Sequence, residues 1–168
     1  ELGVAGLTPN SAMLTGIASP AQTAVLNDPN TLDGVPTLAG YIKKIFLVSD
    51  NNAFNRLYEF LGQERINEKL AAKGYASANI YHRLALPLNE AENRSTNPVQ
   101  FSDSLGNSLY SQPLATSKLV YTSRKDAVGN GYMNGTQLVN QPLDFSNKNR
   151  FGLEDMTKVL RAILFPES

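Results

Sequence analysis

The tripeptide Ser49-Asp50-Asn51 brings a hydroxyl, a carboxylate and a carboxamide together where the apolar run 45–48 ends. A hydroxyl both donates and accepts a hydrogen bond, so it suits proton relay, and a carboxamide offers a donor and an acceptor, so it suits the binding of a polar substrate. Ser, Asp and Asn are also the preferred residues for capping a helix. A structural cap is therefore the simplest explanation of the tripeptide taken alone.

Other residue types exclude several kinds of chemistry. The 168 residues contain no Cys and a single His, His82, which rules out disulfides, thiol nucleophiles and a metal centre with several His ligands. Gly129 and Gly131 lack both the third Gly and the strand-to-helix context of a phosphate-binding loop. We therefore expect no metal and no cofactor.

Charge and hydropathy exclude some classes of partner. The 15 basic and 15 acidic residues give a formal net charge of zero, so no overall field attracts nucleic acid or an anionic membrane. No stretch approaches the roughly 18 consecutive apolar residues that indicate a transmembrane helix. We expect no nucleic-acid partner and no membrane span. The length and the 42% hydrophobic content are typical of a single domain over residues 1–168.

The chain before the tripeptide falls into two parts. Residues 1–36 are interrupted by Gly, Pro, Asn, Thr and Ser, which indicates an irregular path. Thr37 is a suitable N-cap, and apolar residues at helical spacing after it predict a helix to about Val48. This helix opens a helical core that we expect over residues 37–74.

Two further helices are predicted after that point. Ser49 or Asp50 can cap the first of them, and Gly62 is suited to end it with a positive φ. Its expected apolar stripe comprises Ala53, Leu57, Phe60 and Leu61. The second is indicated by strong helix formers over residues 63–73 and ends at Gly74.

Helical periodicity is lost over residues 75–152, and so long a connection favours a functional or family-specific insertion. Within it, Gly129-Asn130-Gly131 or Asn134-Gly135 can turn a small sheet or hairpin. The β-prone pieces that could pair are residues 109–110, 119–121, 132–133 and 137–139. A closing helix is predicted over residues 153–165, before Pro166. The predicted fold class is mainly α with a small β excursion.

The surroundings of the tripeptide carry a family resemblance. Residues 49–57 resemble the Ser-Asp-Asn helix of the superfamily of penicillin-binding proteins and class A β-lactamases, including the Ala and Asn that follow at fixed steps. Residues 83–91 resemble the omega loop of class A β-lactamases. The resemblance covers about residues 37–91 and 151–165. The superfamily's other signatures, Ser-x-x-Lys and Lys-Thr-Gly, do not occur in the 168 residues.

The resemblance implies the helical lobe of a bacterial serine hydrolase that transfers acyl groups through an acyl-serine. It implies that Ser49 relays a proton toward the leaving nitrogen, that Asn51 holds the acylamide of the substrate, and that Asp50 is structural. We expect the partner to be a missing α/β lobe of the parent enzyme, and the substrate to be peptidoglycan-like or a β-lactam. The expected location is the periplasm or the exterior, and the isolated chain is expected to be inactive.

The omega-like segment departs from the resemblance at one position. When it is aligned through residues 88–91, Ala85 stands where class A enzymes have the catalytic Glu that serves deacylation. An alanine can neither accept a proton nor orient a water molecule. Glu90 or Glu92 could replace it from a shifted loop, although a solvated loop carboxylate is the simpler interpretation of both.

A second interpretation comes from a different class of protein. A binding or structural module could keep the helical scaffold and lose the chemistry, which fits the absence of Ser-x-x-Lys and Lys-Thr-Gly. The parent reading frame discriminates the two interpretations. Ser-x-x-Lys encoded before residue 1 and Lys-Thr-Gly encoded after residue 168 would favour the enzyme lobe.

Overall fold

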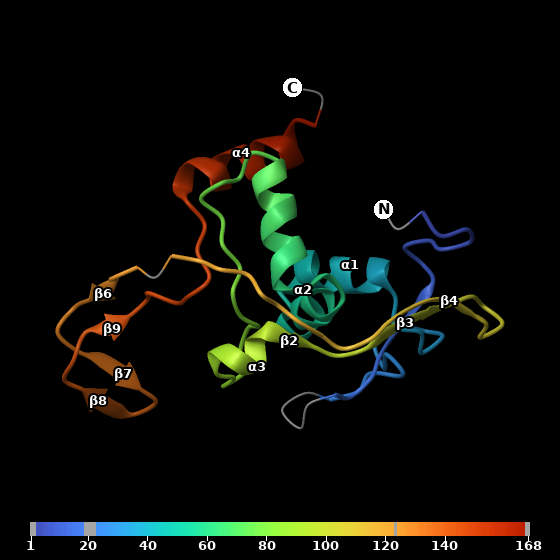
Figure 1. Cartoon of the computed structure of the whole chain (residues 1–168), viewed down its shortest axis with the longest axis horizontal. Coiled ribbons are helices and arrows are strands. Elements are labelled where there is room, and N and C mark those ends of the chain that lie inside the picture. Colours follow the sequence, from blue (N-terminus) through green and yellow to red (C-terminus); the bar gives the residue numbers. More distant parts are fainter. Residues whose placement is uncertain (1–2, 19–22, 123, 167–168) are drawn as a thin grey trace. The chain divides into compact units, whose positions relative to one another are not determined.

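The computed structural model describes residues 3–18, 23–122 and 124–166, which form four helices and nine short strands (Figure 1). The helices are α1 (Leu38–Val48), α2 (Asn51–Ala72), α3 (Glu90–Arg94) and α4 (Leu153–Leu164). The strands are β1 (Ala12–Thr15), β2 (Ser95–Thr96), β3 (Val99–Ser102), β4 (Ser108–Gln112), β5 (Ala115–Thr116), β6 (Ala127–Val128), β7 (Tyr132–Asn134), β8 (Gln137–Val139) and β9 (Leu143–Asp144).

The chain divides into two compact units. The first comprises the described residues up to 66 together with residues 82–118, and the second comprises residues 67–81 and those from 119 onward. The helix α2 begins in the first unit and ends in the second. The expectation of a single domain stays a prediction.

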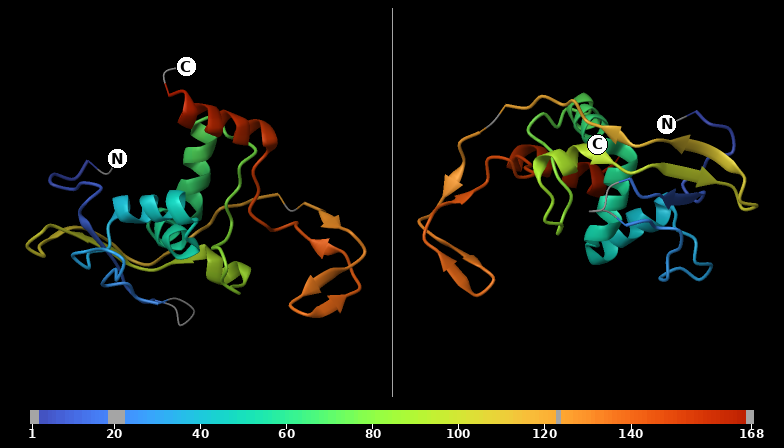
Figure 2. Two further views of the ribbon diagram at one scale, coloured as in Figure 1. Left: turned by 180° about the vertical axis from the view of Figure 1, so that it is seen from behind. Right: turned by 60° about the horizontal axis from the view of Figure 1, so that its bottom comes forward.

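The core of the first unit lies between two helices and an antiparallel sheet with the order β1-β3-β4. The register sets Met13 of β1 opposite Phe101 of β3, and both side chains are almost fully buried. The helices contribute Tyr41 and Ala53 to this core. Phe60 of α2 packs edge-on against Phe101, with ring centroids 5.0 Å apart. Figure 2 shows the β3–β4 ribbon, in yellow, from two further sides.

The predicted helix boundaries in the first unit are confirmed. Thr37 caps α1, since its side-chain oxygen accepts a hydrogen bond from the N–H of Gly40 at 3.0 Å. Gly62 interrupts α2 with φ 70° and ψ 164°, a conformation that glycine adopts without steric cost. The predicted apolar stripe of α2 is correct in part. Ala53 is buried, Leu57 and Phe60 pack against the core, and Leu61 is exposed.

The fold contains more strand than the sequence predicts, so it is a mixed α/β fold and the expectation of a mainly α fold is confirmed only in part. The predicted small sheets are present. β1 lies within residues 1–36, where an irregular path is expected, and it forms because β3 supplies a partner far along the chain. The prediction of a strand at residues 119–121 is wrong, because this segment lies outside the strands.

The second unit contains the predicted hairpin and the closing helix. β7 pairs with β8, and Asn134 faces Gln137 across a two-residue turn in which Gly135 has φ 61°. The two loop residues are therefore Gly135 and Thr136, and Asn134 is the last residue of β7, so the predicted Asn134-Gly135 turn is confirmed only in part. The closing helix α4 ends at Leu164, as its apolar spacing and the following Pro166 predict. Its apolar residues from Leu153 to Leu164 are largely exposed.

Candidate functional site

Ser49 occupies the tight turn between α1 and α2. Its φ of 54° and ψ of 44° lie in the left-handed region, and its N–H donates to the carbonyl of Ile45 at 3.0 Å. A residue other than glycine in this region costs about 1–3 kcal/mol, and such strain tends to occur at functional sites. The Ser49 side chain is exposed, and no residue within the described ranges bonds its hydroxyl.

Asp50 caps the first turn of α2. Its Oδ1 accepts the N–H groups of Asn52 at 2.8 Å and Ala53 at 3.0 Å, and its carbonyl accepts the N–H of Phe54. The side chain thereby pairs two backbone donors that the helix cannot satisfy itself, and the bond from Phe54 is the first regular bond of the helix. Asp50 is half-buried, whereas Asn51 beside it is exposed. The cap therefore holds the Ser49 and Asn51 side chains at the surface on either side of Asp50.

Asn55 joins α2 to the omega-like segment, residues 83–91. Its Nδ2 donates to the carbonyl of Leu84 at 2.9 Å, and its Oδ1 accepts the Leu84 N–H at 2.8 Å. Asn55 is buried, so both bonds are shielded from water. The Asn55 amide thus pairs both the N–H and the carbonyl of Leu84, and it fixes the backbone of the residue that precedes Ala85.

A buried ion pair fixes the beginning of the same segment. Arg83 Nε donates to Glu59 Oε1 at 2.9 Å, and each residue is only 2% exposed. Arg83 Nη2 also donates to the carbonyl of Ser95 at 2.7 Å, and the guanidinium lies over the Tyr58 ring at 4.7 Å from its centroid. The second Glu59 oxygen, Oε2, accepts the N–H of Asn97 at 2.7 Å. Both oxygens of the carboxylate are therefore engaged.

Asn93 closes this arrangement from α3. Its Oδ1 accepts the Arg83 N–H at 2.9 Å, and its Nδ2 donates to the carbonyls of Leu88 and Asn89. Asn93 is buried, and its carbonyl accepts the Tyr58 hydroxyl at 2.8 Å. We call Glu59, Arg83, Asn93 and Asn97 the Arg83 cluster. Together with Asn55, the cluster holds the omega-like segment against α2.

Ala85 has no carboxylate to offer, and it has an unusual backbone. Its φ is 55°, in the left-handed region. The two nearby glutamates are engaged elsewhere: Glu90 pairs with Arg94 at 2.6 Å, and Glu92 Oε2 accepts the Asn89 N–H at 2.7 Å. The Asn89 side chain accepts the Glu92 N–H in return, which completes a capping box at the start of α3.

Burial shifts the pKa of two groups on α1 and α2. Desolvation raises the pKa of Tyr41 to about 12, so its phenol is neutral over the physiological range. Desolvation also lowers the pKa of Arg56, although the charge of Glu59 opposes this shift. The guanidinium of Arg56 donates to the carbonyl and the hydroxyl of Thr23 at 2.8 and 2.9 Å.

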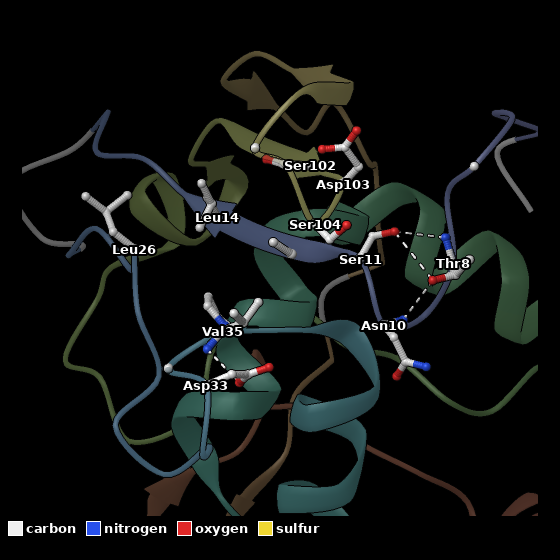
Figure 3. Close-up of a pocket in the computed structure, with 15 residues that line it drawn as sticks. Thr8, Asn10, Ser11, Leu14, Leu26, Asp33, Val35, Ser102, Asp103 and Ser104 are labelled. Atoms are coloured by element: carbon white, nitrogen blue, oxygen red, sulfur yellow. Dashed lines mark hydrogen bonds between the residues drawn. The ribbon is translucent and has the colours of Figure 1, made fainter.

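A pocket of about 860 Å³ lies in the first unit near β1 and β3 (Figure 3). Its lining combines polar residues such as Ser11, Asp33 and Ser102 with apolar ones such as Leu14. The Asp33 carboxylate accepts the Val35 N–H at 3.0 Å and so belongs to a local turn. Ser49, Asp50 and Asn51 are not part of this lining.

The sequence identifies the tripeptide, Arg83 and, through the family resemblance, Asn55, but it does not identify the other residues that anchor the loop. Glu59, Asn93 and Asn97 are buried polar residues, and in the sequence they are indistinguishable from solvated surface residues. The available signal is the four-residue spacing of Asn55 and Glu59, which places two polar side chains on one face of α2.

A capped Ser-Asp-Asn turn followed by an anchored omega-like segment is the arrangement expected of a β-lactamase-like serine hydrolase. The model of the Beta-lactamase enzyme family matches residues 20–167, which is most of the chain. The chain belongs to this family. No curated protein and no solved structure matched the chain.

The described residues, those outside 1–2, 19–22, 123 and 167–168, contain no group of three or more His, Cys, Asp or Glu side chains that could hold a metal ion. None of their helices has the length and apolar character needed to cross a membrane.

Proposed function

We propose that this chain is the helical lobe of a bacterial serine hydrolase that transfers an acyl group through an acyl-serine. Its partner in the parent enzyme would be an α/β lobe that carries the Ser-x-x-Lys nucleophile and the Lys-Thr-Gly signature. The observation that carries the proposal is the Ser49-Asp50-Asn51 turn, capped at the start of α2 in a chain of the Beta-lactamase enzyme family. The isolated chain would be inactive, because neither signature occurs in its 168 residues.

Each residue of the turn would have a separate role. The exposed Ser49 hydroxyl would relay a proton toward the leaving nitrogen, and the exposed Asn51 amide would bind the acylamide of the substrate. Asp50 would position both residues through its bonds to the N–H groups of Asn52 and Ala53. Its role would be structural, since its Oδ1 accepts both bonds.

The substrate would be a peptidoglycan-like amide or a β-lactam, encountered in the periplasm or outside the cell. Acylation and deacylation would proceed at different rates. Ala85 offers no general base, and Glu90 and Glu92 are engaged with Arg94 and Asn89. General-base assistance is typically worth about 10²- to 10⁴-fold, so its loss would let the acyl-enzyme accumulate. The parent would then behave like a penicillin-binding protein rather than an efficient β-lactamase.

A fluorescent penicillin tests the proposal on two proteins, the 168-residue chain and the product of the full parent reading frame. We expect no covalent labelling of the chain and stable labelling of the parent, with slower labelling in parent Ser49→Ala. Intact-mass measurement after mixing should show an adduct that persists. Labelling of the isolated chain would refute its inactivity, and rapid turnover by the parent without a trapped adduct would refute the role given to Ala85.

A non-catalytic module is the second candidate, and one observation favours it. The 168 residues contain neither Ser-x-x-Lys nor Lys-Thr-Gly, while the scaffold around α2 retains its buried bonds. A parent reading frame that also lacks both signatures, and a parent that no penicillin labels, would decide for a binding or structural role.

A further inference from the structure

Arg56 is a half-buried cation whose hydrogen bonds go to neutral acceptors. It lies in the second turn of α2, and Nη1 and Nη2 donate to the carbonyl and the hydroxyl of Thr23. No carboxylate among the residues that the structure describes forms an ion pair with it. A guanidinium carries five N–H donors, so the two bonds to Thr23 leave further donors available.

The guanidinium borders a cavity of about 80 Å³. Asn52, one turn earlier in α2, lines the same cavity, and Leu86 of the omega-like segment and Thr23 form other parts of its wall. Because a water molecule takes up about 30 Å³ in the liquid, the space is larger than one water but far smaller than a pocket for a drug-sized ligand. Its volume can hold a group of a few non-hydrogen atoms.

The charges around the cavity leave a positive excess. Glu59 and Arg83 also line it, but they neutralise each other, and both Glu59 oxygens already accept hydrogen bonds from Arg83 and Asn97. Among the residues that the structure describes, no carboxylate forms an ion pair with Arg56, although the charge of Glu59 acts on it from nearby. Its burial weakens hydration of the guanidinium, which makes an anionic ligand more favourable than water.

We propose that this cavity binds the carboxylate of a small ligand through the Arg56 guanidinium and the Asn52 amide. A carboxylate matches the fork of N–H donors of arginine and forms short, charge-assisted hydrogen bonds with it. The ligand would contact α2, Thr23 and Leu86 together, so it would tie the omega-like segment to the helix. The site goes beyond the proposed function, because binding at Arg56 needs no nucleophile.

The test uses the 168-residue chain labelled with ¹⁵N and follows the Arg56 Nε–H signal and the backbone amides of Asn52 and Leu86. Sodium acetate is the probe for a free carboxylate, N-acetylalanine is the probe for a carboxylate at the end of a peptide, and acetamide is the neutral isostere. Ionic strength is held constant with sodium chloride. We expect saturable shifts with a carboxylate and none with acetamide. Stronger binding of N-acetylalanine than of acetate would assign the site to chain ends.

Two variants complete the test. Arg56→Gln should weaken carboxylate binding by about tenfold or more, since a charge-assisted contact is lost. Arg65→Gln, which removes an exposed arginine elsewhere on α2, should leave the affinity unchanged. Equal responses to acetate and acetamide in the wild-type chain would overturn the proposal, and that comparison decides the matter even if Arg56→Gln does not fold. Unchanged affinity in folded Arg56→Gln would also overturn it.

Discussion

Replacing Glu59 by Gln would break the buried ion pair while keeping the shape of the side chain. The carboxylate accepts the Arg83 Nε–H through Oε1 and the Asn97 N–H through Oε2. A carboxamide has one acceptor oxygen, so one of the two donors would face an NH₂ group. Arg83 would also lose the countercharge of Glu59 in a region without solvent.

The size of the effect follows from burial. The side chains of Glu59 and Arg83 are 3% and 1% exposed. Removing one member of such a pair typically costs about 3–5 kcal/mol, because the other charge is left uncompensated. Arg83 keeps its bond to the Ser95 carbonyl, so we expect a loss near the lower limit, about 3 kcal/mol. Domains have about 5–15 kcal/mol of stability in total, so the variant should fold but be clearly weakened.

Urea unfolding followed by circular dichroism measures the loss, and hydrogen exchange of the Asn97 amide reports it locally. The control is Glu90→Gln, which breaks the exposed pair with Arg94, a kind of pair worth about 0.2–1 kcal/mol. The double variant Glu59→Met/Arg83→Met should be less destabilised than the sum of its single variants, since no buried charge remains. If Glu59→Gln lowers the midpoint no more than Glu90→Gln, the argument from buried charge is refuted.

Two further predictions concern a cap and a carboxyl group. Asp50→Ala should cost about 1 kcal/mol or more of stability, because the N–H groups of Asn52 and Ala53 lose their acceptor. An unchanged melting temperature would contradict the capping role. In the second unit, hydrogen bonds from the Ser77 hydroxyl and N–H hold the pKa of Asp155 below its usual value. The stability that this adds is present above the pKa of the unfolded chain and is lost as the pH falls through the folded pKa. Ser77→Ala should therefore raise the pKa of Asp155 in an NMR titration, and a titration identical to that of the wild type would argue against this cause.

The helices are predictable from the sequence because their signals are local. Thr37 bonds the N–H three residues later, and Gly62 supplies the positive φ that interrupts α2. The spacing that predicts α4 likewise lies within its own residues. Propensity and capping act over a few residues, so a sequence pattern contains all the information these elements need.

The strands and the loop anchor depend on partners far along the chain. Ala12 of β1 pairs with Ser102, and the residues around β1 contain no signal that predicts this partner. Residues 119–121 show the reverse, since they are β-prone but lie outside the strands. Tyr121 stacks on Tyr81 with ring centroids 4.1 Å apart. Strand propensity measures how well a residue fits a sheet surface, so it does not by itself place a segment in a sheet.

The loop anchor also explains how the backbone at Ala85 is maintained. A left-handed conformation at a residue other than glycine persists only where the surroundings determine it. On the preceding side, Asn55 holds Leu84 by two bonds, and Arg83 is held by Glu59 and Asn93. The scaffold of the omega-like segment is therefore independent of any carboxylate at position 85. The anchored scaffold therefore does not by itself imply deacylation, because the residues that hold the loop are not those that would activate water.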